Sequence, residues 1–281
     1  MKEFKYLRPI TLEEASHYLV KLGDRVHILN GGTDLVVRMR NRITVPVAVV
    51  DIKHIEELNK ISFDEEKGIF IGATVSISEM CQNDHVIEKY PLLLEACSLL
   101  GSVQIRNRAT CVGNICNASP LADTSTPLLV LGAKVHIYGP NGDREVAIDE
   151  FFIGVRKTCL ELGEIVKGIS IPSESQGFKG AFHKISRRRE VDLSTVCASV
   201  GKIQDDYRIA FGAVAPTPIR AKNIEAFLQG KTLGEDVIKE AVGLVEKEIS
   251  PIDDIRASKE YRIDMSQVLL ERGLKALLNK E

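Results

Sequence analysis

The chain has 281 residues, of which 44% are hydrophobic and 27% are charged, and its formal net charge is −2. This composition is typical of a water-soluble protein with one large or two to three small domains, and it argues against a nucleic-acid surface, which is normally strongly basic. The first eight residues carry charges where a secretory signal has an apolar core, and no apolar run approaches the ~20 residues that span a bilayer. We therefore expect a cytoplasmic protein that binds neither nucleic acid nor membrane.

The first module, residues 1–55, is predicted to alternate strands with a helix. Thr11, followed three residues later by Glu14, has the pattern of a capping box and predicts the start of a helix. The apolar runs 26–29 and 45–52 predict strands on either side of a Gly-rich loop. Together these elements predict a small βαβ-like unit.

The second module, residues 56–175, is expected to combine a sheet with short helices. Its elements are marked by alternating apolar residues, by capping residues and by turn-forming Gly and Pro. In chain order, they are a hairpin at 61–71, a short helix capped by Ser76 and Glu79, a helix opened by Pro91 and closed near Gly101, and strands at 134–138 and 165–171.

The third module, residues 176–281, follows a polar linker at 172–177 that is rich in residues that break helices and strands. It is predicted to hold a three-stranded sheet, in which a short turn makes the last two strands an antiparallel pair. The expected strands are 181–186, 194–203 and 207–215, and the expected helices are 221–228, 235–248 and 266–278. The chain as a whole is therefore predicted to be α+β.

Two segments concentrate small polar residues. Segment 110–123 reads T-C-V-G-N-I-C-N-A-S-P-L-A-D, and segment 30–35 reads N-G-G-T-D-L directly after the strand-like run 26–29. Gly lets the backbone approach a ligand closely, and Asn, Ser and Thr offer short polar contacts. Consecutive backbone N–H groups in such loops form concave anion sites, in which phosphate is the usual guest. Two such loops predict a nucleotide-like cofactor that is held at two places.

These signals also have simpler interpretations. Segment 30–35 lacks the G-x-G-x-x-G spacing of a Rossmann turn and the Lys of a P-loop, so a plain turn with one Gly at positive φ would also explain it. Asp123 is either an acceptor for sugar hydroxyls or the N-cap of the apolar element that follows. The basic run 187–189 is followed by Glu190 and Asp192, which favours local ion pairing over nucleic-acid binding.

No set of residues in the sequence forms a recognisable catalytic or metal-binding constellation. The six His and six Cys have none of the usual ligand spacings, and reduced thiols in a cytosolic protein account for the cysteines. Neither a nucleophile elbow nor a kinase-like motif is present. We therefore expect no metal site in this chain, and we expect any redox or group-transfer chemistry to come from a bound cofactor.

The motifs resemble those of one family, the FAD-binding subunits of molybdenum hydroxylases. Segment 30–35 is similar to the family's A-G-G-T-[DS]-L loop, and segment 104–123 is similar to its second FAD motif. Segments 212–220 and 256–262 resemble most closely the bacterial xanthine dehydrogenase subunits. The resemblance covers essentially the whole chain. It implies a PCMH-type FAD-binding domain over residues 1–175, with subdomains 1–55 and 56–175, and a C-terminal domain of the CO dehydrogenase flavoprotein type over residues 176–281.

The resemblance also implies the residues that contact FAD. Segment 30–35 would hold the pyrophosphate, the second motif would contact the ring, the ribityl chain or the phosphates, and Lys184 would lie near the isoalloxazine. Two positions depart from the family pattern, because Asn30 replaces an Ala and Val112 replaces the first Gly of G-G-N. The implied cofactor-binding set is Leu29, Asn30, Gly31, Gly32, Thr33, Asp34, Leu35, Thr110, Gly113, Asn114, Asp123 and Lys184.

By the same resemblance, the protein is an electron-transfer subunit of a hetero-oligomer. A large subunit would carry molybdopterin, a small subunit would carry [2Fe–2S] clusters, and electrons would pass through FAD to NAD⁺ or another acceptor. Xanthine is the substrate that the similarity favours, and a nicotinate, other N-heterocycle or aldehyde dehydrogenase remains an alternative. A standalone flavin oxidoreductase and a non-catalytic adaptor are the other classes left open.

Overall fold

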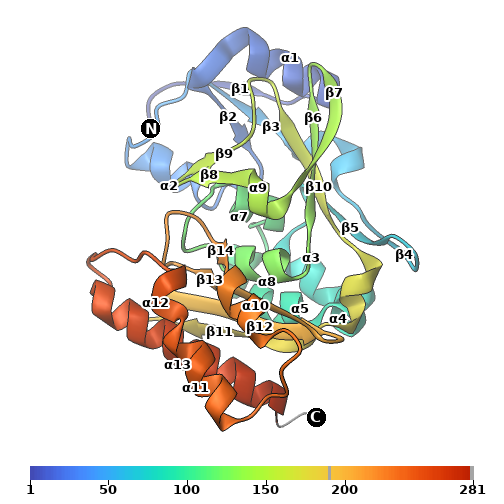
Figure 1. Ribbon diagram of the computed structural model, residues 1–281. Coiled ribbons are helices and arrows are strands. Elements are labelled where there is room, and N and C mark those ends of the chain that lie inside the picture. Colours follow the sequence, from blue (N-terminus) through green and yellow to red (C-terminus); the bar gives the residue numbers. More distant parts are fainter. Residues whose placement is uncertain (189–190, 279–281) are drawn as a thin grey trace.

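The computed structural model describes residues 1–188 and 191–278. Within these ranges the chain forms a three-stranded, a five-stranded and a four-stranded sheet together with a small two-stranded hairpin (Figure 1). No helix in the described ranges is long and apolar enough to cross a membrane. Local ion pairing was predicted for the basic run 187–189 with Glu190 and Asp192, and residues 189 and 190 lie outside the described ranges. Inside these ranges, Arg188 pairs with Asp192.

The first module is a small parallel sheet covered by one helix; the sequence predicted this helix and the strands β2 and β3, but not β1 or α2. Strand order is β1-β3-β2, and both outer strands run parallel to β3. The capping box predicted at the helix start is only half present: the Thr11 hydroxyl accepts a hydrogen bond from Glu14 N, but the Glu14 carboxylate accepts one from Ile10 N. The elements are β1 (Lys5–Leu7), α1 (Leu12–Leu22), β2 (Val26–Leu29), α2 (Leu35–Arg40) and β3 (Ala48–Asp51), with 3₁₀ turns at Gly23–Arg25, Ile52–His54 and Glu56–Leu58.

The second module is built on a five-stranded antiparallel sheet of order β4-β5-β10-β6-β7. The capping box at Ser76 and Glu79 and the helix start at Pro91 are confirmed. The strands are β4 (Ile61–Asp64), β5 (Gly68–Gly72), β6 (Lys134–Gly139), β7 (Gly142–Ala147) and β10 (Ile165–Ile171), with a hairpin of β8 (Phe152–Gly154) and β9 (Lys157–Thr158). The helices are α3 (Ile77–Gln82), α4 (Asp84–Lys89), α5 (Pro91–Ser98), α6 (Val103–Arg106), α7 (Cys111–Cys116), α8 (Ser125–Val130) and α9 (Ile148–Phe151).

The C-terminal sheet has four antiparallel strands, which corrects the prediction of three. The added strand is only two residues long and pairs Ala210 with Arg220 and Phe211 with Ile219, so it leaves no alternating pattern in the sequence. The helix expected at 235–248 is broken at Leu244. The elements are a 3₁₀ turn at Ser173–Gly177, β11 (Lys179–Ile185), β12 (Val196–Ile203), β13 (Asp206–Gly212), β14 (Ile219–Arg220), α10 (Lys222–Leu228), α11 (Glu235–Gly243), α12 (Val245–Glu248) and α13 (Lys259–Leu278).

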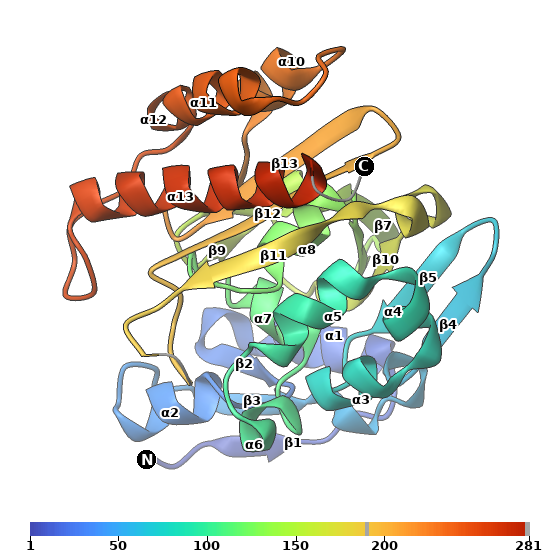
Figure 2. The same cartoon turned by 90° about the horizontal axis from the view of Figure 1, so that it is seen from below.

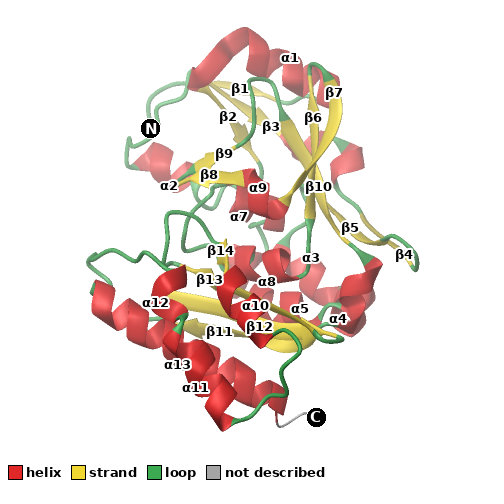
Figure 3. Ribbon diagram, in the orientation of Figure 1, coloured by secondary structure: helices red, strands yellow, loops and turns green. Residues whose placement is uncertain are grey.

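Helices cover both faces of this sheet, and they come from different modules. Helix α13 packs on β11 and β12 from one side, while α5 and α8 of the second module pack on the other side (Figures 2 and 3). Gly273 allows the close approach of α13, because a Cβ at this position would lie 2.5 Å from Val200 Cβ. The Ser199 hydroxyl donates to Thr126 Oγ1 across the other face at 3.0 Å. The C-terminal sheet therefore shares apolar contacts with helices on the other side of the boundary predicted at 175/176. The division of the chain at this position stays a prediction.

Candidate functional site

A cavity of about 530 Å³ lies where the two segments of small polar residues meet. Its volume is within the range of cofactor and ligand sites, roughly 300–1,000 Å³. Both predicted segments contribute to its wall: Asn30, Gly31, Gly32, Thr33, Asp34 and Leu35 from one, and Thr110, Gly113 and Asn114 from the other. The structure therefore brings together two segments that are about eighty residues apart and belong to different modules.

The loop after β2 needs its glycines for packing and for backbone conformation. A Cβ on Gly31 would lie 2.1 Å from the carbonyl oxygen of Arg108, which is far inside van der Waals contact, and Gly32 has φ +77°. In the described part of the chain, four successive backbone N–H groups in this loop find no acceptor: those of Gly31, Gly32, Thr33 and Asp34. Unpaired successive amides at a cavity wall are suited to an anionic ligand such as phosphate.

The second segment is a short helix rather than an open loop. Thr110 is the N-cap of α7, and its hydroxyl accepts a hydrogen bond from Gly113 N at 2.9 Å. Val112 is buried in the first turn of this helix, where negative φ is normal. The Asn114 carboxamide oxygen accepts a hydrogen bond from the Thr124 hydroxyl at 2.6 Å. Side-chain hydrogen bonds therefore hold this wall of the cavity in its helical conformation.

Asn30 ties the two walls together. Its carboxamide nitrogen donates to the carbonyl oxygen of Ala73 at 2.6 Å and to the Thr110 hydroxyl at 2.9 Å. Its backbone oxygen accepts from Lys53 Nζ at 3.2 Å. The carboxamide oxygen is buried and has no hydrogen-bond partner among the described residues. An orphaned acceptor of this kind is costly unless a ligand or water satisfies it.

Arg156 is a cavity residue that the sequence analysis missed. It lies in the β8–β9 turn at φ +55°, a conformation that few non-Gly residues adopt. Its guanidinium donates to the Asn117 carboxamide oxygen at 2.6 Å and lies 3.4 Å from an oxygen of Asp34. No local pattern marks a single arginine in a turn, so only the fold brings it to the cavity.

Glu164 fixes the remaining side of the cavity, which segment 160–166 forms. Its two carboxylate oxygens pair with the Arg144 guanidinium at 2.6 and 2.7 Å, and one of them also accepts from Glu161 N at 2.7 Å. The hydrogen bonds from Arg144 lower the pKa of Glu164 and outweigh the opposing effect of burial. The segment is further held by the Ser16 hydroxyl, which donates to the Gly163 carbonyl at 2.8 Å.

Three predicted site residues do not line the cavity. Leu29 lies behind the loop, where it would meet a Cβ on Gly32 at 3.0 Å. Asp123 and Lys184 form a buried ion pair at 2.6 Å, and the other oxygen of Asp123 accepts from the Ser194 hydroxyl at 2.5 Å. The alternative interpretation of Asp123 as an N-cap is wrong, because Thr124 occupies the N-cap position of α8.

The comparisons with known proteins cover the whole of this architecture. The family described as the FAD binding domain in molybdopterin dehydrogenase matches residues 2–174, and the CO dehydrogenase flavoprotein C-terminal domain matches residues 181–277. The chain belongs to the FAD-binding medium subunits of the molybdenum hydroxylase family. It is thus an FAD-dependent oxidoreductase subunit.

Individual members of the family are similar over nearly their full length. The xanthine dehydrogenase FAD-binding subunit of Escherichia coli O157:H7 is 32% identical over 95% of this chain and 93% of its own. The glyceraldehyde dehydrogenase medium chain of Sulfolobus acidocaldarius is 32% identical over 97% of this chain and 98% of its own. A solved structure of carbon monoxide dehydrogenase from Hydrogenophaga pseudoflava superposes with a TM-score of 0.93 at 31% identity, covering 98% of this chain and 97% of that one.

Within this family, the two departures at Asn30 and Val112 are both accommodated. Val112 is helical, so the second motif needs Gly only at position 113, where a Cβ would lie 2.9 Å from Thr110 Oγ1. Asn30 adds a side-chain bridge between the two motifs. The unpaired amides and the orphaned Asn30 oxygen fit a dinucleotide cofactor in this cavity.

Proposed function

We propose that this chain holds FAD in the cavity between segments 30–35 and 110–117 and serves as the electron-transfer subunit of a multi-subunit molybdenum hydroxylase. The observation that carries the proposal is the row of unpaired backbone amides at Gly31–Asp34, held against Arg108 by a glycine that cannot be replaced without a clash. These amides suit the cofactor's pyrophosphate, which is dianionic and needs several donors at once.

Each remaining part of the cavity has a role in this proposal. Thr110, Gly113 and Asn114 offer polar contacts on the opposite wall, and Arg156 supplies a positive charge near the pyrophosphate. Leu100 and Ile105 form an apolar part of the wall, next to the Leu99 carbonyl that Lys184 Nζ approaches at 3.5 Å. We thus propose that Lys184 and Asp123 support this wall from behind and do not contact the cofactor themselves.

When bound, FAD supplies the exchange between single-electron and two-electron transfer, which this chain's own side chains cannot provide. The protein's part is to bind the cofactor, to orient it and to exclude water from one side of it. We propose that a [2Fe–2S] small subunit delivers the electrons, that a molybdopterin-binding large subunit hydroxylates the substrate, and that NAD⁺ or another acceptor takes the electrons from FAD.

The substrate of the assembled enzyme is proposed to be xanthine or another N-heterocycle, because segments 212–220 and 256–262 resemble xanthine dehydrogenase subunits, and it is proposed to bind to another chain. Relatives named for xanthine, glyceraldehyde and carbon monoxide lie within one percentage point of identity, at 31–32%. A subunit that contacted the substrate would be expected to separate these classes more clearly. The near-equality therefore supports a substrate site that lies on another chain.

A flavin titration tests the proposal. The purified chain is titrated with FAD while flavin fluorescence is followed, and FMN serves as the matched ligand that lacks the second phosphate and the adenosine. Saturable binding of FAD with much weaker binding of FMN is the expected result. If neither flavin binds, either to the chain alone or to the complex purified from its native host, the proposal fails.

A further inference from the structure

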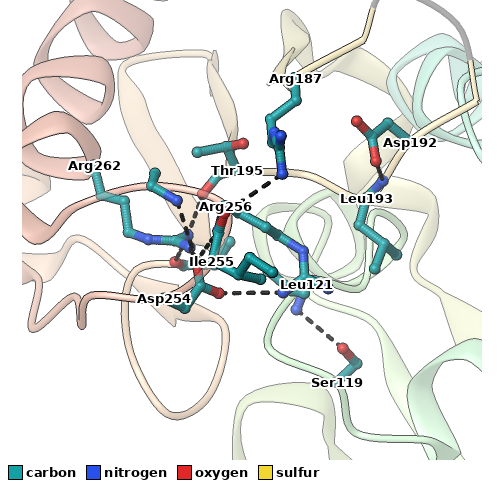
Figure 4. Close-up of polar contacts among 12 residues, drawn as sticks. Ser119, Leu121, Arg187, Asp192, Leu193, Thr195, Asp254, Ile255, Arg256 and Arg262 are labelled. Carbon is teal, nitrogen blue, oxygen red and sulfur yellow. Dashed lines mark hydrogen bonds and ion pairs between the residues drawn. The ribbon is translucent and has the colours of Figure 1, made fainter.

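A second cavity, of about 210 Å³, lies in the C-terminal domain and shares no lining residue with the first. It forms where the segment between β11 and β12 meets the segment between α12 and α13 (Figure 4). Nothing in the proposed function uses it. Its lining residues are Ser186, Arg187, Thr195, Arg256, Ala257 and Tyr261.

The second cavity carries an excess of positive charge. Arg256 pairs with Asp254 at 3.2 Å, and the buried Arg262 pairs with the other oxygen of Asp254 at 2.7 Å. Arg187 makes only a long contact, at 3.4 Å, to the backbone oxygen of Ile255, and within the described ranges it has no carboxylate partner. Figure 4 shows these groups gathered around the turn at Asp254. Arg256 and Arg262 therefore share one carboxylate, and among the described residues none balances the charge of Arg187.

Two hydroxyl groups at the second cavity are unpaired. Thr195 is only 2% exposed, and its hydroxyl has no hydrogen-bond partner in the part of the chain that the structure describes. The phenol of Tyr261 likewise has no partner there. Because Tyr261 is 44% exposed, its hydroxyl can donate to a ligand that enters the cavity from solvent. Both hydroxyls border the same space as Arg187 and Arg256.

We propose that the second cavity binds a phosphate group. Two guanidinium groups and two hydroxyls from separate segments offer donors to several oxygens at once, which suits a tetrahedral anion better than a planar carboxylate. The volume of about 210 Å³ lies below the roughly 300 Å³ at which sites for whole drug-sized ligands begin, so the cavity fits a single phosphate group rather than an entire nucleotide.

Calorimetric titration of the full chain with inorganic phosphate at low ionic strength tests this site. We expect one saturable site, whose dissociation constant rises about tenfold or more in R187Q and in R256Q, since each loses a charged hydrogen-bond donor. Tyr261→Phe removes one unpaired hydroxyl from an exposed position and is expected to weaken binding with the fold intact. Arg40→Gln, on the exposed side of α2, is the matched control and should bind as the wild type does.

Three outcomes would overturn the proposal: no saturable heat, wild-type affinity in the R187Q/R256Q double variant, or equal affinity for acetate. The second outcome would place the phosphate in the first cavity. Adenosine monophosphate as a competitor identifies the source of the group. If adenosine monophosphate competes with inorganic phosphate, the site accepts a phosphate group that is part of a larger ligand. If adenosine monophosphate leaves phosphate binding unchanged, the ligand is the free phosphate ion.

Discussion

The ammonium group of Lys184, on strand β11, lies 2.6 Å from the carboxylate of Asp123, which precedes helix α8 in the second module. Both side chains are less than one-tenth exposed. Burial raises the pKa of the Asp123 carboxyl, and the charge of Lys184 and the hydrogen bond from Ser194 oppose this effect. The pair thus joins the C-terminal sheet to the domain that carries the cofactor cavity.

Lys184→Met is expected to destabilise the protein by about 3–5 kcal/mol, because it leaves the Asp123 carboxylate buried without its counter-charge. Urea unfolding followed by circular dichroism measures this change. Lys179→Met, an exposed position on the same strand, is the matched control and should change little. Adding Asp123→Leu to Lys184→Met should recover much of the stability, and a double variant as unstable as the single one would contradict the role given to the pair.

Gly31→Ala is expected to weaken FAD binding strongly, since its Cβ would meet the Arg108 carbonyl at 2.1 Å and force the two cavity segments apart. The dissociation constant for FAD, from fluorescence quenching, is the readout. Gly243→Ala is the control, because a Cβ there meets nothing within 4 Å. Equal FAD affinity in both variants would refute the proposed cofactor position.

Arg156→Gly is expected to reduce FAD affinity by about tenfold, through loss of a charged donor at the cavity. Glycine keeps the positive φ of this turn, so the backbone is not strained by the change. Arg42 has φ +58° and is exposed, and Arg42→Gly is therefore a matched control. If both variants bind FAD equally, Arg156 serves the turn rather than the cofactor.

Acid is expected to loosen the wall that Glu164 fixes. The folded state lowers the pKa of Glu164 below its ordinary value of 4.5, so its stabilisation is present above that pH and is lost as the pH falls through the lowered pKa. Because Arg144 is partly exposed, the contribution is about 1 kcal/mol.

Thermal unfolding of Glu164→Gln between pH 3 and 7 checks this expectation. The variant should be less stable than the wild type near neutral pH, and the difference should shrink towards pH 3. Glu57→Gln, at an exposed position, serves as the control. A difference that does not depend on pH would show that the loss comes from packing rather than from the ion pair.

Capping residues and an N-terminal proline in the sequence correctly predicted where two of the helices begin. The capping box at Ser76 and the proline start at Pro91 are present where the sequence placed them. Strand β14 was missed because its two residues are ordered by pairing with β13, which is a long-range effect. The start of α13 at Lys259 was missed because its first turn carries charged residues, including the buried Arg262, so no apolar period extends that far.

The residues of the candidate site likewise fall into those that a local sequence pattern predicted and those that only long-range contacts bring to the cavity. Gly31 and Thr110 were found because their segments have an unusual composition, and both line the cavity. Arg156 and Glu164 were missed as cavity residues because each reaches it through contacts with segments far away in the sequence. Asp123 was predicted as a cofactor contact but does not line the cavity, and its tie to Lys184 and Ser194 could not be inferred, since no sequence pattern states which strand will pack on it.

The packing of the C-terminal sheet against α5 and α8 affects how the protein can be divided. Phe178 and Phe182, beyond the predicted boundary, belong to the same apolar cluster as the second module, and Ala213 N donates to the Pro120 carbonyl at 2.7 Å. A fragment that ends at residue 175 would uncover this apolar face, and such exposed patches promote aggregation. Dissection of the flavin domain for expression or crystallisation therefore requires residues beyond the boundary that the sequence suggests.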